Sequence, residues 1–489
     1  MPSMPVSTLE LDLGGARRPL RRVWEFGFNT CHAPLAMRSD LQAHMREAAG
    51  RLGMRYWRCH GTLSDDVGIL TRDARGRAAY AFSGLKRIVD AGLAAGVKPF
   101  FELSFMPEEL VRDPSRTVTH YRGPISPPRD FARWRELVSR TVRFLAETYG
   151  KKEVRTWYFE VWNEPNIPFW DGTQAEYFRL YREAAEAVKA VDPGFRVGGP
   201  ATARAAWVAD LLAFCRKGRV PLDFVSTHIY PSDVAFVEGA AGEVKLLGLD
   251  FLHRHFARVR AEADAAGGPR LPVIWGEWNS SAGPLAANHD DANNAALVSG
   301  ALAGIARHGD GSLFWNLSDV YEECQYHFLP FHGGYGLYTV DGIPKSAARA
   351  FELFHGLEAR EVPVRHGAAN ARRGILASCD PARRKVRAIL WNHREEGRAA
   401  AAWDAEVDLG RFSAVRAETH RIEPGRGSAY EAWKRMGMPA NLSVPQRRRL
   451  LAASEPKRAV STWSAARSKI GLRVPAGTAL RLDLDLKPL

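Results

Sequence analysis

Short runs of β-branched and aromatic residues alternate with amphipathic stretches of helical period from about residue 20 to residue 357. This alternation predicts a parallel α/β architecture, because a helix must return the chain between successive parallel strands. Eight strands are predicted, at residues 23–29, 55–59, 98–103, 156–162, 195–199, 224–228, 273–278 and 312–316. Since eight strands close a (β/α)8 barrel, we predict the α/β class with a TIM barrel over residues 15–357.

The predicted helices carry recognisable end signals. Residues 130–149 place their large apolar side chains on one face, and Gly150 follows where a C-terminal cap is expected. Thr173 and Glu176 have the spacing of a capping box, which predicts the start of the next helix. Residues 345–357 are predicted to form the helix that closes the barrel.

Beyond residue 358 the pattern changes to short alternating strands, at residues 386–391, 405–409, 415–422 and 479–486. This predicts a β-sandwich accessory domain at the C-terminus. The last strand alternates leucine with charged residues, as Leu9, Leu11 and Leu13 do, so we predict that the N-terminal strand joins the sandwich. The expected domain is residues 1–14 plus 358–489, with a small helical insertion near 429–454.

Composition narrows the class of protein. With 46% hydrophobic and 25% charged residues, the 489-residue chain has the balance of a globular protein. No stretch of about 18 apolar residues is present, so no membrane partner is expected. The first residues lack the basic start and apolar core of a signal peptide, which favours the cytoplasm. The five cysteines form no CxxC pair, which argues against a disulfide framework or a zinc site.

A formal net charge of +13 raises the alternative of binding to acidic polymers. The basic runs are short, and no recognition motif supports them, so no nucleic acid partner is expected.

Polar and aromatic residues gather where the predicted strands end. In a parallel barrel the active site lies at the C-terminal ends of the strands, so these residues meet at one face. Taken singly, Glu102 or Glu323 is as well explained as an ion-pair partner, and His60 or His228 as a buried core histidine. Together they predict a site of the size of a sugar: His60, Glu102, Asn163, Glu164, His228, Tyr230, Glu277, Trp315, Asp319, Glu322 and Glu323.

Glu164 and Glu277 are the predicted catalytic pair, at the ends of strands four and seven. Glycoside hydrolysis needs one carboxyl group to protonate the leaving oxygen and another to act on the anomeric carbon. A separation of about 5–5.5 Å would imply retention of configuration, and about 6.5–9.5 Å would imply inversion. We assign Glu164 as acid/base, because Trp162 and Pro165 suggest a poorly solvated setting. Glu277 becomes the nucleophile, and we expect His228 and Tyr230 to support its ionised form.

The sequence resembles the retaining β-xylosidases of glycoside hydrolase family 39. The motifs that carry the resemblance cover nearly the whole chain: Cys59-His-Gly-Thr-Leu-Ser-Asp-Asp66, Tyr121-Arg-Gly-Pro-Ile-Ser-Pro-Pro128, Trp162-Asn-Glu-Pro-Asn166, Thr227-His-Ile-Tyr-Pro231, Gly276-Glu-Trp-Asn279, Ser318-Asp-Val-Tyr-Glu-Glu323, Phe331-His-Gly-Gly-Tyr-Gly-Leu337 and Ala429-Tyr-Glu-Ala-Trp-Lys-Arg-Met-Gly437.

The resemblance implies exo-acting release of xylose from short xylo-oligosaccharides, with no cofactor and no metal. It implies that Glu164 is the acid/base, Glu277 the nucleophile and Asn163 a ligand of the sugar 2-hydroxyl. The further substrate-binding residues that it implies are His60, His228, Tyr230, Trp315, Glu322 and Glu323. The C-terminal region looks shorter than in longer members, which leaves the oligomeric state open between a monomer and a small homo-oligomer.

Three alternatives remain at this point. An α-L-iduronidase activity would need a cation for the substrate carboxylate, and the strand ends offer acidic Glu322 and Glu323 instead. An endo-acting glycanase with the same catalytic residues depends on loops that the sequence does not describe. A catalytically silent carbohydrate-binding barrel would keep both carboxylates but misplace them. α-L-Arabinosidase side activity is compatible with the main hypothesis.

Overall fold

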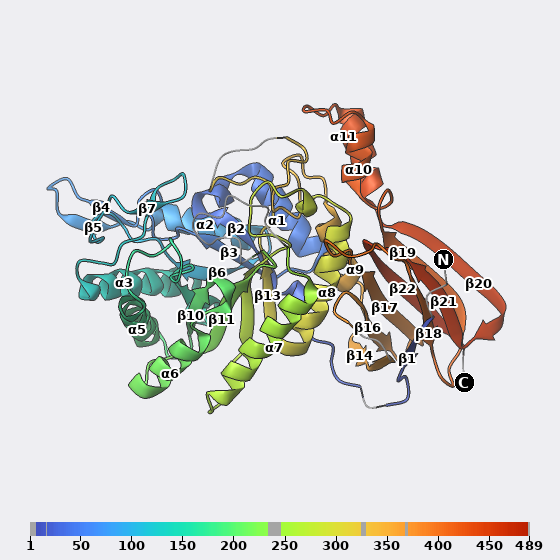
Figure 1. The fold of residues 1–489 in the computed structure, drawn as a ribbon. Coiled ribbons are helices and arrows are strands. Elements are labelled where there is room, and N and C mark those ends of the chain that lie inside the picture. The colour runs from blue at the N-terminus through green and yellow to red at the C-terminus, as the bar shows by residue number, and fades with distance from the viewer. Residues whose placement is uncertain (1–5, 16, 233–245, 324–328, 367–369, 488–489) are drawn as a thin grey trace.

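The structure is a computed structural model that describes residues 6–15, 17–232, 246–323, 329–366 and 370–487. It holds a closed barrel of eight parallel strands on one side and two packed antiparallel-rich sheets on the other (Figure 1). The predicted fold class is confirmed. The division into domains at residues 14 and 357 stays a prediction.

All eight predicted barrel strands form, and each pairs in parallel with its neighbours. Their bounds are β2 (Gly27–His32), β3 (Tyr56–His60), β6 (Lys98–Leu103), β9 (Tyr158–Val161), β10 (Arg196–Thr202), β11 (Phe224–Ile229), β12 (Val273–Trp278) and β13 (Gly311–Phe314). The first strand begins later than predicted, because Val23–Glu25 form a 3-10 turn. Strand β2 starts at Gly27, where a Cβ would lie 2.1 Å from the Tyr56 carbonyl oxygen, so only glycine permits this close pairing.

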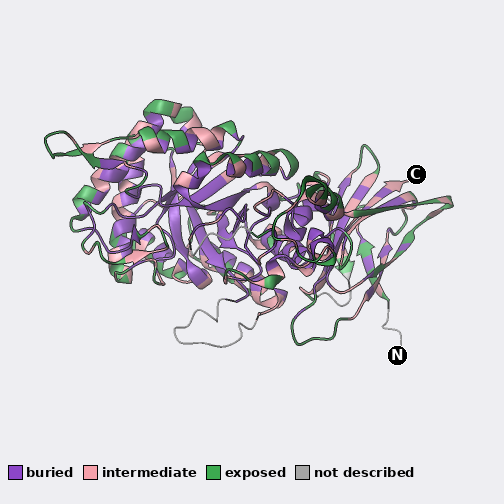
Figure 2. Cartoon of the chain, turned by 90° about the horizontal axis from the view of Figure 1, so that it is seen from above, coloured by how far each residue is buried: buried purple, intermediate pink, exposed green. Residues whose placement is uncertain are grey.

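Helices surround the barrel and expose their outer faces, whereas the strands are buried along their length (Figure 2). The helices are α1 (Ser39–Arg51), α2 (Ser83–Ala94), α3 (Phe131–Tyr149), α4 (Lys151–Val154), α5 (Gln174–Val191), α6 (Val208–Gly218), α7 (Leu249–Ala265), α8 (Asn293–His308) and α9 (Ser346–His355). The capping box of Thr173 and Glu176 is present at the start of α5. No helix in the described ranges is long and apolar enough to cross a bilayer.

The two ends of the barrel differ in polarity. At the end where the strands begin, an apolar cluster fills the interior: Phe26, Phe100, Tyr158, Phe224, Ile274 and Leu313. Aromatic rings in this cluster pack at centroid distances of about 5 Å. Because this layer closes the barrel, substrate access is left to the opposite end, where the predicted polar residues lie.

The remaining strands form a six-stranded sheet, β14-β16-β17-β22-β19-β20, and a four-stranded sheet, β15-β1-β18-β21. Their bounds are β1 (Ser7–Leu11), β14 (Arg360–Val362), β15 (Val364–His366), β16 (Arg373–Asp380), β17 (Lys385–Asn392), β18 (Trp403–Asp408), β19 (Ala414–Ile422), β20 (Lys457–Arg467), β21 (Lys469–Val474) and β22 (Thr478–Leu486). Leu9, Leu11 and Leu13 are buried in the core between the sheets. The predicted N-terminal strand is confirmed, since β1 pairs with β18 and with β15.

Smaller elements lie outside the barrel and the two sheets. The predicted helical insertion consists of α10 (Ala429–Arg435) and α11 (Val444–Ser454), with a capping box of Ser443 and Gln446. Trp433 and Leu450 of these helices pack on Phe331, which follows the last barrel strand. Two short hairpins, β4 (Leu70–Arg72) with β5 (Ala78–Tyr80) and β7 (Thr117–Val118) with β8 (Gly123–Pro124), complete the fold. Cys31, Cys59, Cys215 and Cys379 are buried free thiols, and Cys324 lies outside the described residues.

Candidate active site

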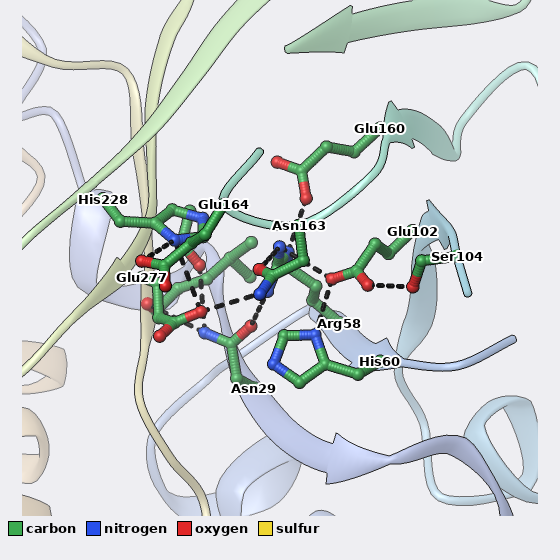
Figure 3. Close-up of polar contacts among 12 residues, drawn as sticks. Asn29, Arg58, His60, Glu102, Ser104, Glu160, Asn163, Glu164, His228 and Glu277 are labelled. Carbon is green, nitrogen blue, oxygen red and sulfur yellow. Dashed lines mark hydrogen bonds and ion pairs between the residues drawn. The ribbon is translucent and has the colours of Figure 1, made fainter. Parts of the chain in front are cut away.

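Arg58 lies inside the barrel and joins carboxylates from three other strands (Figure 3). Strand β3 buries it completely, and its Nε is 2.6 Å from Glu160 Oε2. Its Nη2 is 2.7 Å from Glu102 Oε2, and its Nη1 is 3.4 Å from Glu277 Oε2. The charge of one guanidinium is therefore shared among three carboxylates. Sequence reasoning missed Arg58 and Glu160; the signal was a single charged residue within a short apolar strand.

Two asparagines fix the orientation of Arg58. Its Nη2 donates to Asn163 Oδ1 at 2.9 Å, and its Nη1 donates to Asn29 Oδ1 at 3.2 Å. Asn29 Nδ2 in turn donates to the Gly276 carbonyl oxygen at 3.0 Å, which ties the guanidinium to strand β12. The carbonyl end of Asn163 thus faces Arg58, and its NH2 end is left to serve as a donor.

Glu164 and Glu277 approach each other at the mouth of the barrel. A carboxylate oxygen of each lies within 4.8 Å of the other and of a ring nitrogen of His228. As whole residues, Glu164 and Glu277 are 8% and 6% exposed, so each keeps a small surface that solvent reaches. Trp162 and Glu164 have positive φ angles of 71° and 42°, which are strained for residues other than glycine. This sharp turn after β9 directs Asn163 toward Arg58 and Glu164 toward His228 (Figure 3).

His228 connects the two carboxylates. Its Nδ1 is 3.0 Å from Glu164 Oε1 and 3.4 Å from Glu277 Oε2. Burial lowers the pKa of His228 well below its usual value, and the charges of Arg58 and His60 lower it further. A neutral ring with its proton on Nδ1 donates to these oxygens, a tautomer that we assign from the geometry.

The environment of Glu277 agrees with the donors expected from the sequence. Tyr230 donates its hydroxyl hydrogen to Glu277 Oε1 at 2.6 Å, and His228 lies on the other oxygen. Burial raises the pKa of Glu277, and Arg58, His60 and Tyr230 oppose that rise. Arg58, His60 and Tyr230 thus favour the ionised form of the Glu277 carboxylate against the effect of burial.

His60 links a buried carboxylate to a more accessible one. Its Nδ1 is 2.8 Å from Glu102 Oε2 and its Nε2 is 3.3 Å from Glu323 Oε1. Burial opposes the charged form of His60, but Glu102 and Glu323 outweigh it and raise the pKa of the ring. Glu102 also accepts from Ser104 and is fully buried, so it supports Arg58 and His60 and does not face the mouth.

Burial raises the pKa of Glu323 to about 7, with the negative charge of Glu277 adding to the rise and His60 opposing it. Tyr321 donates to the second carboxylate oxygen of Glu323 at 2.9 Å. Glu323 is therefore a mouth carboxylate whose charge changes near neutral pH.

Glu322 forms an ion pair with His32. Sequence reasoning missed His32. His32 Nδ1 is 2.5 Å from Glu322 Oε1, and its Nε2 is 2.9 Å from Asp66 Oδ2. Burial disfavours the charged ring, yet Asp66 and Glu322 raise the pKa of His32. The ring of Tyr121 stacks on it at 3.8 Å with an interplanar angle of 5°. The imidazole ties the segment after β13 to the end of β2.

Trp315 lies at the end of β13, with its ring centroid 5.0 Å from that of His60. Its backbone N–H donates to the Trp278 carbonyl oxygen, and Tyr335 packs on it edge to face at 6.2 Å. Of the strand-end residues that the sequence singled out, Asp319 has a different place. Its Oδ2 is 2.6 Å from the buried Nζ of Lys345, which also pairs with Asp290, so Asp319 is a structural residue.

Glu164, His228 and Glu277 are also the group of described residues that could hold a metal ion. Two carboxylates and an imidazole suit several divalent cations. However, Arg58 already places a positive charge 3.4 Å from Glu277, which would repel a cation there. The expected absence of a metal stays a prediction.

Comparison with known proteins gives the same family throughout the chain. The model of glycosyl hydrolases family 39 matches residues 8–469. A β-xylosidase of Caldicellulosiruptor saccharolyticus is 36% identical over 94% of this chain and 93% of its own length. A β-xylosidase of Geobacillus stearothermophilus is 37% identical over 86% of this chain and 84% of its own.

Among solved structures, a monomeric β-xylosidase of Caulobacter crescentus CB15 superposes with a TM-score of 0.87 at 31% identity, covering 98% of this chain and 99% of that one. The barrel, the pair of glutamates at its mouth and these matches lead to one conclusion: the chain belongs to glycosyl hydrolases family 39.

Proposed function

We propose that the protein is a retaining, exo-acting β-D-xylosidase that releases xylose from the non-reducing end of short xylo-oligosaccharides. The observation that carries the proposal is the approach of Glu164 and Glu277, with a carboxylate oxygen of each within 4.8 Å of the other. An approach this close favours the separation of about 5–5.5 Å found in retaining enzymes over the about 6.5–9.5 Å at which inverting enzymes hold a water.

In the first step Glu164 donates its proton to the glycosidic oxygen while a Glu277 oxygen bonds to the anomeric carbon. The bond to the leaving sugar breaks, and a xylosyl ester of Glu277 forms. In the second step Glu164 takes a proton from water, the water oxygen attacks the anomeric carbon, and Glu277 leaves as a carboxylate. The two displacements restore the original configuration and the original protonation of Glu164.

The neighbours of the pair have roles that follow from their contacts. Tyr230 and Arg58 stabilise Glu277 as an anion, which it must be before attack and after release. His228 donates to Glu164 and holds its carboxyl group beside Glu277. Asn163, with its carbonyl end on Arg58, presents its NH2 end to the sugar 2-hydroxyl. Trp315 supplies an apolar surface for the ring, and His60, Glu322 and Glu323 bind hydroxyl groups.

The charges at the mouth favour a neutral pentose over a uronic acid. An α-L-iduronide carries a carboxylate that would meet Glu322 and Glu323, while the guanidinium of Arg58 is already paired with three glutamates. Xylose has no such group. We therefore expect an aryl β-D-xyloside to be hydrolysed much faster than an aryl α-L-iduronide. The reverse order would refute the substrate assignment.

Azide distinguishes the two catalytic roles. In Glu277→Ala, azide occupies the place of the nucleophile and should restore turnover of an activated aryl β-xyloside with an α-xylosyl azide product. In Glu164→Ala, azide attacks the glycosyl-enzyme and should give the β-azide, and substrates with poor leaving groups should suffer most. Glu323→Ala is the matched control, because it removes a neighbouring carboxylate and should show no rescue. Exchanged anomers, or rescue of all three variants, would contradict the roles.

A further inference from the structure

Two histidines at the ends of adjacent barrel strands contact the two consecutive glutamates of the mouth. His32 ends β2 and His60 ends β3, and the two are register partners in the ladder. His32 Nδ1 is 2.5 Å from Glu322 Oε1. His60 Nε2 is 3.3 Å from Glu323 Oε1. Each of the two carboxylates therefore has an imidazole of its own, and the proposed function as stated gives His32 no role.

Two further segments enclose the imidazole of His32. Its Nε2 is 2.9 Å from Asp66 Oδ2, in the segment after β3. In the same segment, Gly61 has a positive φ of 71°, and a Cβ there would lie 3.2 Å from His32 Cδ2. The ring of Tyr121, between β7 and β8, stacks on the imidazole at 3.8 Å with an interplanar angle of 5°. His32 is 3% exposed, so these contacts fix the ring plane and with it the direction of Nδ1.

The contact with Nδ1 orients the carboxylate of Glu322. The backbone of this segment is held separately, because the His120 N–H donates to the Glu323 carbonyl oxygen at 2.9 Å. A backbone contact leaves the torsions of a glutamate side chain unset, and fixing them costs conformational entropy. An anchor that fixes these torsions before a sugar binds therefore improves the affinity for that sugar.

The charge of the imidazole adds to this effect. Burial lowers the pKa of His32, but Asp66 and Glu322 outweigh burial and raise the pKa, which favours the charged ring. A charged donor makes a stronger hydrogen bond to a carboxylate than a neutral donor does. Glu322 is thus held by a charge-assisted contact.

We propose that His32 is a positioning residue that sets the affinity for the sugar by orienting the carboxylate of Glu322. The inference rests on the proposed function, because that function makes Glu322 an acceptor for sugar hydroxyl groups. His32 acts through Glu322, so a substitution that keeps the donor to Glu322 should keep most of the affinity. A substitution that removes this donor should lose it.

Two near-isosteric substitutions separate the nitrogens of the ring. The amide nitrogen of asparagine stands in the place of Nδ1, and that of glutamine stands in the place of Nε2. His32→Asn keeps a donor for Glu322 and should weaken D-xylose binding at most about threefold. His32→Gln keeps a donor only for Asp66 and should weaken D-xylose binding at least about tenfold, because a hydrogen bond to a charged group is lost. Calorimetric titration of the full chain with D-xylose measures both affinities, and equal losses or the reverse order would overturn the proposal.

A double-mutant cycle tests whether His32 acts through Glu322. Glu322→Gln removes the charged acceptor, so adding His32→Gln to it should weaken xylose binding no further. Losses that multiply in the double variant would show that His32 affects sugar binding by another route, and they would refute the positioning role.

His44→Gln is the matched control. His44 is also buried, its Nδ1 is 2.8 Å from Ser318 Oγ in the same segment, and its ring stacks on Tyr338. The variant loses an equivalent anchor of this segment and should leave the affinity for xylose unchanged. A loss equal to that of His32→Gln would mean that any loosening of the segment has this effect, and it would overturn the specific role of His32.

If His32→Gln does not fold, Asp66→Ala takes its place, because the side chain of Asp66 is 46% exposed. This variant should weaken xylose binding in the wild-type background and have no effect in Glu322→Gln. Effects of the same size in both backgrounds, or in neither, would refute the proposal. A wild type that cleaves a different aryl glycoside would refute the xylosidase assignment instead, and the asparagine and glutamine variants titrated with the sugar that it releases would still decide the role of His32.

Discussion

Replacing Arg58 by methionine is the most informative single perturbation of this site. The side chain contacts Glu102, Glu160 and Glu277, and the first two of these carboxylates are fully buried. Removing one partner of a buried ion pair costs about 3–5 kcal/mol, and here two buried carboxylates lose their partner at once. We expect the free energy of unfolding to fall by an amount at the upper end of that range. This is a large part of the about 5–15 kcal/mol that stabilises a typical fold.

The same change should alter the pH dependence of catalysis. Glu277 must be ionised to attack, so activity is lost as the pH falls through its pKa. Burial raises that pKa and Arg58 opposes the rise. Without Arg58 the pKa of Glu277 moves further up, and the acid limb of the kcat/KM profile moves to higher pH. Arg58→Lys, which keeps the charge, should shift the limb less than Arg58→Met does.

Denaturant unfolding and the pH profile of kcat/KM measure these two effects. Arg112→Met is the matched control, because Arg112 and Glu176 form an exposed pair worth at most about 1 kcal/mol. Combining Arg58→Met with Glu160→Gln neutralises one of the orphaned carboxylates and should recover at least about 1 kcal/mol. Arg58 does not stabilise the buried glutamates if Arg58→Met is as stable as Arg112→Met, and it does not favour the ionised form of Glu277 if the acid limb stays in place.

Four further outcomes are expected. Tyr230→Phe removes a 2.6 Å hydrogen bond to Glu277 and should lower kcat/KM about 10- to 100-fold, the equivalent of about 1.5–3 kcal/mol. The acid limb of the kcat/KM profile should also move to higher pH, and an unchanged limb would contradict the role of Tyr230 in stabilising the Glu277 anion. The inhibition constant of D-xylose should improve as the pH rises through about 7, where Glu323 ionises and becomes a better acceptor, and Glu323→Gln should abolish that dependence. Lys345→Met leaves two buried aspartates without their cation and should lower the free energy of unfolding by about 3–5 kcal/mol and raise KM. Lys86→Met, at an exposed ion pair, should lower the free energy of unfolding by at most about 1 kcal/mol. Treatment with a metal chelator should leave kcat unchanged; loss that Mg²⁺ or Mn²⁺ restores would show that a cation is required.

The sequence predicts the barrel, the sandwich and the catalytic pair, because periodicity and strand ends are local signals. It predicts His60, Asn163, His228 and Tyr230 as site residues for the same reason, and the structure brings all four into one network with the glutamates.

The residues that sequence reasoning misses are those whose meaning depends on register. Arg58 and Glu160 are single charges inside short strands, and only the closed barrel decides whether such a side chain points inward or toward a helix. His32 is missed because the predicted first strand ends at residue 29. In the structure the strand begins at Gly27 and ends at His32. The partner of Asp319 is Lys345, which directly precedes α9 and lies 26 positions away, and no local pattern indicates that pair.

The place of β1 has a consequence for how the molecule can be made and divided. This strand lies between β15 and β18, so a segment that precedes the barrel completes a sheet whose other strands follow the barrel. Until those strands are synthesised the leucines of β1 have no core to enter, and afterwards they join segments from both sides of the barrel. A barrel produced alone would carry an apolar tail, and the sheets produced alone would show two open edges to other copies. Production in two separate pieces should therefore fail by aggregation, whereas a circular permutant that fuses the N-terminal strand to the second piece should remain soluble.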